Sequence, residues 1–93
     1  MIGPDSRPRR RGKQVLTQQV SDTLILLHLD NGEYYKLDEV GSRVWELCDG
    51  TRTVTDAVSV ICEEYEACAE TVEADVLALV RELADEKMVD EGN

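Results

Sequence analysis

The sequence contains no phenylalanine, one tryptophan and a single histidine among 93 residues. Its core must therefore be built mainly from Val, Leu and Ile. No apolar run reaches the roughly 18 residues that a membrane-spanning helix requires. The basic start of the chain also lacks the apolar stretch of a secretion signal. These absences, together with the length, predict one small domain in the cytoplasm, without a membrane partner.

Catalytic and metal-binding patterns are also missing. The three cysteines (Cys48, Cys62 and Cys68) match no zinc-ligand spacing, and His28 stands alone on a predicted strand. The GxSxG, HExxH, P-loop and GxGxxG patterns do not occur. The sequence therefore predicts a protein that is not an enzyme, holds no metal and needs no cofactor.

The charge is divided unequally along the chain. The net charge is −10, yet residues 1–13 hold five basic residues and one acid, and the rest holds five basic residues and nineteen acids. We expect residues 1–13 to form a disordered basic tail, residues 14–90 the folded domain and residues 91–93 a flexible C-terminus. The alternative is that the tail contacts an anionic partner or the acidic body of the chain itself. Because the acidic body repels phosphate backbones, nucleic-acid binding is disfavoured.

Three strands are predicted first: "KQVLTQQV" (13–20), "TLILLHL" (23–29) and "EYYKL" (33–37). They form an antiparallel meander whose third strand lies at an edge. The hairpin register stays open between a two-residue Asn31-Gly32 loop and a three-residue loop with Gly32 as a bulge. The second is favoured because it separates apolar from polar side chains better. It places Ile25, Leu27, Leu29, Tyr35 and Leu37 on one face, and His28, Tyr34 and Lys36 on the other.

Three helices should follow the strands. Asp38 is the predicted N-cap of a helix over 39–48, in which Gly41 would allow a close backbone approach. Thr53 and Asp56 predict a capping box at the start of the second helix. The last helix, over about 71–86, carries an apolar stripe at helical spacing. The predicted fold class is α+β.

Several linked motifs carry a family resemblance. "YYKL" precedes a capping acid, "VGSRVWEL" lies on the first helix, "CDGTRTV" forms the turn, and "VEADV" begins the last helix stripe. Over about residues 20–90 the chain resembles the PqqD family, also called the RiPP recognition element. The resemblance implies a winged-helix-like domain that binds the leader of a ribosomally made precursor peptide. It also implies presentation of that precursor to a modifying enzyme: a radical SAM protein in pyrroloquinoline quinone biosynthesis, or another maturase or protease.

The resemblance also implies where the leader binds. In the family the leader adds as a further strand to the third strand, in a groove walled by the third helix. Carried over to this sequence, the edge strand is Glu33, Tyr34, Tyr35, Lys36 and Leu37. The candidate wall residues on the last helix are Val72, Asp75, Val76, Leu79 and Leu83.

Two other functions remain open from the sequence. A winged-helix DNA-binding regulator could use "RPRRR" as an arm, but its recognition helix would carry six acids against Arg81 alone. A dimerisation adaptor could pair its bare edge strand with a second copy, giving a homodimer. In that case Tyr34 and Tyr35 would be ordinary packing residues.

Overall fold

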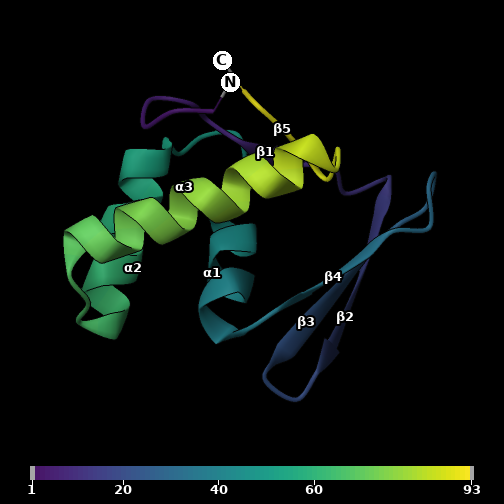
Figure 1. The fold of residues 1–93 in the computed structure, drawn as a ribbon, viewed down its shortest axis with the longest axis horizontal. Helices are drawn as coiled ribbons and strands as arrows, with labels where there is room; N and C mark the ends of the chain where they lie inside the picture. Colours follow the sequence, from purple (N-terminus) through teal and green to yellow (C-terminus); the bar gives the residue numbers. More distant parts are fainter. Residues whose placement is uncertain (1, 93) are drawn as a thin grey trace.

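A three-stranded antiparallel sheet and three helices make up most of the fold. The computed structural model describes residues 2–92. The sheet has the order β2-β3-β4, formed by β2 (Val15–Val20), β3 (Thr23–His28) and β4 (Tyr34–Leu37). The helices are α1 (Glu39–Leu47), α2 (Val54–Tyr65) and α3 (Ala69–Asp85), and they pack together beside the sheet (Figure 1). The predicted order of three strands and three helices is confirmed.

Local capping signals fix where α1 and α2 begin. The Asp38 carboxylate accepts a hydrogen bond from the Gly41 N–H at 2.8 Å. Thr53 and Asp56 form a reciprocal capping box, with N–O distances of 3.0 and 3.1 Å. Both predicted caps are confirmed, because each satisfies backbone N–H groups that have no partner inside the helix.

The hairpin register differs from both predicted alternatives. His28 pairs with Glu33 through a 2.8 Å N–O bond, and Leu27 lies opposite Tyr34. The loop therefore spans the four residues 29–32, and Gly32 adopts a positive φ of 74°. The inward face of the hairpin carries Leu24, Leu26, His28, Tyr35 and Leu37, whereas Ile25, Leu27 and Tyr34 point outward.

The physical reason for this register lies in β3 itself. Both of its faces are apolar, so alternation alone cannot choose between them. Which face of β3 points inward depends on His28, which is 3% exposed. Its Nδ1 accepts from the Asp30 N–H at 3.2 Å, so its Nε2–H donates to the Lys87 carbonyl at 3.1 Å. A buried imidazole with both nitrogens paired confirms His28 as a structural strand residue.

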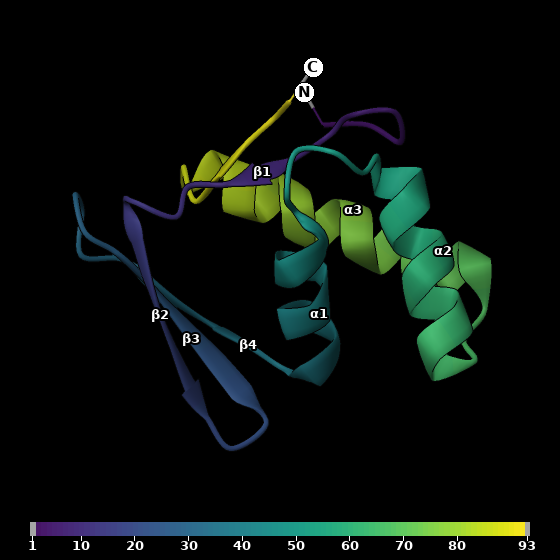
Figure 2. The ribbon, with the colours of Figure 1, turned by 180° about the vertical axis from the view of Figure 1, so that it is seen from behind.

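The segment expected to be a disordered basic tail is ordered in the structure. β1 (Arg9–Arg10) pairs antiparallel with β5 (Val89–Asp90), side by side across α3 (Figure 2). Ile2 is 1% exposed. The Arg10 guanidinium donates to the Trp45 and Glu46 carbonyls at 3.1 and 2.6 Å, at the end of α1.

The chain ends therefore belong to the same folded body as residues 14–90. Arg11 forms a 2.6 Å ion pair with Asp90. The Arg7 N–H donates to the Gly92 carbonyl at 3.2 Å, so residues 91–92, expected to be flexible, continue the pairing. Met1 and Asn93 lie outside the described residues. The tail prediction failed because the partners of these arginines lie 35–79 positions away in sequence.

The core lies between the inward face of the sheet and the three helices. Leu26, Leu83 and Met88 are fully buried, and Trp45 is 5% exposed. Within residues 2–92, no helix is both long and apolar enough to cross a membrane.

We expect Leu83→Ala to lower the free energy of unfolding by about 2–5 kcal/mol, because it leaves a cavity in a closely packed core. Leu83 is 0% exposed. Urea denaturation followed by circular dichroism measures the change. Leu29→Ala is the matched control, because Leu29 is 52% exposed and its truncation should change stability by about 0.5 kcal/mol or less. Equal losses in the two variants would contradict this account of the core.

Candidate peptide-binding groove

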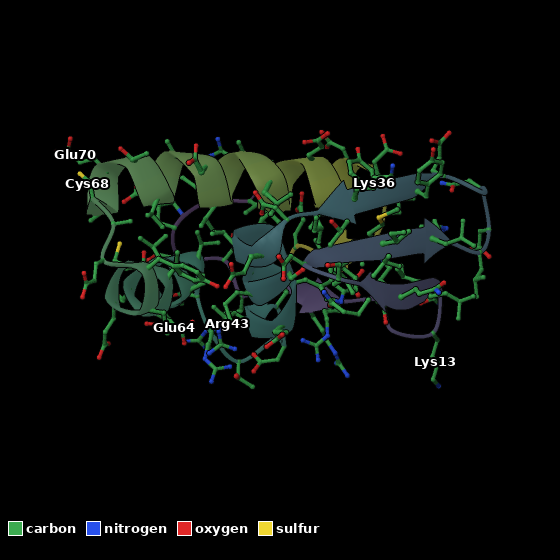
Figure 3. The ribbon with its side chains drawn as sticks, turned by 90° about the horizontal axis from the view of Figure 1, so that it is seen from below. Lys13, Lys36, Arg43, Glu64, Cys68 and Glu70 are labelled. Atoms are coloured by element: carbon green, nitrogen blue, oxygen red, sulfur yellow. The ribbon has the colours of Figure 1, made fainter. Side chains whose placement is uncertain are left out.

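The outer edge of β4 presents free backbone groups. Since Glu33 bonds to His28, the alternation of an antiparallel ladder makes Tyr35 and Leu37 the next residues that bond to β3. Tyr34 and Lys36 therefore direct their N–H and C=O groups away from the sheet. In Figure 3 Lys36 lies on the strand nearest to α3. The predicted edge position of this strand is confirmed.

A groove of about 500 Å³ separates β4 from α3, and α1 closes one end. Its apolar surface comes from all three elements, and its rim is charged. The lining residues are Lys36, Leu37, Asp38, Val40, Gly41, Val44, Asp75, Val76 and Leu79. A free strand edge beside an apolar groove is the arrangement in which an extended peptide can add a strand and bury alternate side chains.

The groove contains five of the ten residues named from the sequence. Lys36 and Leu37 of β4 line it together with Asp75, Val76 and Leu79 of α3. Leu83 and Val72 do not line it and belong to the core, which also includes Leu37 and Val76. Glu33 lies at the hairpin end of β4, and the Tyr34 side chain points to the opposite face of the sheet.

Sequence reasoning missed the contribution of α1. Val40, Gly41 and Val44 line the groove. Val40, in the first turn of α1, is 37% exposed. At Gly41 an added Cβ would lie 3.2 Å from the Leu37 Cβ and from the Asp38 carboxylate, a tight contact that would require these neighbours to shift by a few tenths of an ångström, so glycine favours this close approach of α1 to β4. The sequence signal was Gly41 itself, which has no other reason to lie in a helix.

Tyr35 links the two walls of the groove. Its half-buried side chain points inward from β4, and its hydroxyl donates to the Glu82 carboxylate on α3 at 3.2 Å. Burial and, next, this carboxylate raise the pKa of Tyr35 to about 12. Tyr35 is therefore a neutral hydrogen-bond donor at physiological pH, and its contact with Glu82 fixes the distance between β4 and α3.

The three cysteines are free thiols in different environments. Burial raises the pKa of Cys48 to about 12. Cys68 is exposed, and hydrogen bonds from the backbone N–H groups of Thr71 and Glu70 lower its pKa. Within residues 2–92 no three His, Cys, Asp or Glu side chains gather as a metal site would require.

These differences predict the order of alkylation. At pH 8 iodoacetamide should modify Cys68 at least about a hundredfold faster than Cys48, because the thiolate is the reactive form and Cys48 is both protonated and buried. Mass spectrometry of peptides taken at successive times measures both rates. Adding urea is the control, because unfolding should remove most of the difference. Comparable rates in the folded protein would contradict the burial of Cys48.

A comparison with models of protein families matches residues 23–89 to the family described as coenzyme PQQ synthesis protein D, or PqqD. The match covers well over half of the chain. The chain belongs to the PqqD family. The predicted resemblance is thereby confirmed.

Curated relatives of this PqqD-family chain include proteins named "PqqA binding protein". The one from Bradyrhizobium diazoefficiens is 35% identical over 54 residues, which are 58% of this chain and 52% of that protein. The one from Rhodopseudomonas palustris is 32% identical over 54 residues, or 58% of this chain and 53% of that protein. The match thus spans about half the length of these relatives.

Solved structures share the fold of this PqqD-family chain over nearly their whole length. TbiB1, solved in complex with the TbiA(beta) leader peptide, is 34% identical with a TM-score of 0.76, and the match covers 88% of this chain and 94% of that one. Lasso peptide synthetase B1, complexed with the leader peptide, has a TM-score of 0.77 at 24% identity, with 90% and 98% covered. The second match supports the fold alone.

Proposed function

We propose that this chain is a non-catalytic chaperone that binds the leader of a ribosomally made precursor peptide and presents it to a modifying enzyme. The observation that carries the proposal is the free edge of β4 beside an apolar groove. The names of the curated relatives and the leader complex of TbiB1 support it. The chain would act in the cytoplasm, where such precursors are made.

The leader would add as a fourth strand along β4. The N–H and C=O groups of Tyr34 and Lys36 offer about four hydrogen bonds, each contributing roughly 0.5–1.5 kcal/mol. Alternate leader side chains would enter the groove and contact Leu37, Val76 and Leu79, and each apolar anchor would add about 1.5–3 kcal/mol. Ordering a flexible leader offsets several kcal/mol of this gain. The resulting dissociation constant lies between about nanomolar and micromolar, which suits reversible delivery.

Five of the ten residues named from the sequence line the groove directly and remain part of the proposed site. Tyr34 would contribute its backbone, and Tyr35 would hold the groove open. Glu33 marks the end of the edge strand. Val72 and Leu83 would support the wall from within the core rather than contact the leader.

The charges around the groove favour a basic leader. Asp38 and Asp75 line it, whereas strand alternation directs the Lys36 side chain to the outward face of the sheet. Three further carboxylates, those of Glu82, Glu86 and Glu33, are close enough to Tyr35 to raise its pKa. Carboxylates in these positions would attract Lys or Arg residues that flank the apolar anchors of the leader and would repel acidic segments.

The enzyme served would be a radical SAM protein, as in pyrroloquinoline quinone biosynthesis, or another maturase or protease. Duplex DNA is a poor alternative partner because α3 and its C-cap carry six acids against Arg81: Glu70, Glu73, Asp75, Glu82 and Asp85 in the helix, and Glu86 at the cap. A helix with this charge would be repelled by the phosphates on either side of a major groove.

An NMR titration tests the proposal. ¹⁵N-labelled protein would be titrated with a synthetic leader from a precursor gene beside its own. We expect amide shifts concentrated on residues 33–37 and 72–83, with slow hydrogen exchange at Tyr34 and Lys36 in the complex. A leader with prolines at alternate positions is the control, because it cannot complete the ladder. If no leader from a neighbouring precursor moves these amides, the proposal is wrong.

A further inference from the structure

The outward face of the sheet is a second apolar surface, separate from the groove. Strand alternation places eight side chains on it: Leu16, Gln18, Val20, Thr23, Ile25, Leu27, Tyr34 and Lys36. Leu27 is 37% exposed, Val20 49%, Leu16 57% and Tyr34 62%. These are four of the six large hydrophobic residues exposed within residues 2–92, and Leu29 lies at the adjoining hairpin end. Exposed apolar side chains gathered on one face indicate an interaction surface.

The same face differs in charge from the rest of the molecule. None of its eight side chains is acidic, although the chain contains twenty acids, and its single charge is the cation of Lys36. The helices, which carry half of the acids, lie on the other side of the sheet (Figures 1 and 2). A molecule with a net charge of −10 repels its own kind. The outward face is therefore where two copies can approach with the least repulsion.

We propose that two copies of this chain associate through these outward faces, sheet against sheet, around a twofold axis. Leu16, Leu27 and Tyr34 lie opposite one another on adjacent strands and form a row across the sheet. The row borders a hollow of about 280 Å³ that Ile25 and Gln18 also line. A twofold axis through this hollow would set the row of one copy against the row of the other, as an isologous interface requires. This inference goes beyond the proposed function and does not depend on it.

The size of the face sets the strength of the dimer. Three strands spaced about 4.8 Å apart, of which β2 and β3 have six residues and β4 four, at about 3.3 Å per residue, give a footprint of at most roughly 14 by 20 Å. A stable interface buries about 800 Å² of accessible surface on each partner, which is more than this footprint supplies. The dimer is therefore weak, and it becomes half-populated at roughly hundreds of micromolar protein.

The proposed dimer leaves the edge of β4 free. The edge N–H and C=O groups of Tyr34 and Lys36 lie in the plane of the sheet, whereas face-to-face packing uses side chains perpendicular to it. This distinguishes the proposal from pairing between the edge strands of two copies, which would bury those same backbone groups.

Sedimentation equilibrium of the full chain between 10 µM and about 1 mM tests the proposal. We expect the average mass to rise with concentration, and to rise more at about 500 mM than at 50 mM NaCl, because salt screens the repulsion between acidic bodies. A constant monomer mass over this whole concentration range would overturn the proposal and would indicate that another protein binds the face. Association that weakens with added salt would also overturn it.

A matched pair of variants locates the interface. Leu27→Thr should weaken dimerisation at least about tenfold, because it removes the apolar centre of the row while threonine, a β-branched residue, retains a high strand propensity. Val40→Thr is the control for dimerisation, because Val40 is also 37% exposed but lies on α1. Equal dimerisation by Leu27→Thr and the unaltered chain would contradict the proposal. Slow exchange of the Tyr34 and Lys36 amides at about 1 mM would instead indicate edge pairing and would also contradict it.

Discussion

Leu79→Glu is expected to weaken leader binding by about a hundred- to a thousandfold. Leu79 is half-buried and lines the α3 wall of the groove beside Val76. Glutamate would remove an apolar contact worth about 1.5–3 kcal/mol and would place a carboxylate where the leader excludes water. Asp75 lines the same wall, so the new charge would also be repelled by a neighbouring carboxylate. Fluorescence anisotropy of a labelled leader measures the change in dissociation constant.

Ala78→Glu is the matched control for this variant. Ala78 is the preceding residue of α3 and is exposed to solvent, so the substitution adds the same charge to the same helix outside the groove. We expect its affinity to change by about threefold or less, because exposed charges are screened by salt. If both variants lose affinity equally, the effect is general repulsion and the groove is not the binding site. Circular dichroism of both variants establishes that each is folded.

Lys36→Pro is expected to weaken leader binding by about ten- to a hundredfold. The Lys36 N–H points away from β3, so proline removes no hydrogen bond of the existing sheet. It removes one donor from the free edge, and its ring occupies the space that an added strand requires. A leader carbonyl would then be buried without a partner, at a cost of about 1–3 kcal/mol. Isothermal titration calorimetry with the unaltered leader measures the loss.

Two further variants separate the backbone effect from other causes. Lys36→Gln removes the charge but keeps the N–H, so it should retain most of the affinity. Thr17→Pro places a proline on β2, the opposite edge of the sheet, where the N–H also points away from β3. It should bind the leader as the unaltered chain does. Full affinity in Lys36→Pro would show that the leader does not add to β4.

The outcome for the site shows how far local reasoning reached. The edge strand and the helix that forms the opposite wall were predicted, and Asp75, Val76 and Leu79 do line the groove. Leu83 shares their helical stripe but is fully buried. An apolar stripe in the sequence indicates which side of a helix is buried. It does not indicate where along the helix the core ends and a groove begins. That boundary depends on how far α1 and β4 extend along α3.

The sequence by itself determined the three strands of the main sheet, the three helices, their order and the starts of α1 and α2. Asp38, Thr53 and Asp56 act on backbone groups within three residues of themselves, so their effects could be read locally. Tertiary structure decided the hairpin register, and it decided that the N-terminal segment is ordered where the sequence predicted a disordered tail. The register depends on a bond between His28 and the Lys87 carbonyl, 59 positions apart, and the arginine segment depends on carbonyls at the end of α1. Such contacts form only after the chain has folded, because their strength comes from burial and geometry that no local pattern encodes.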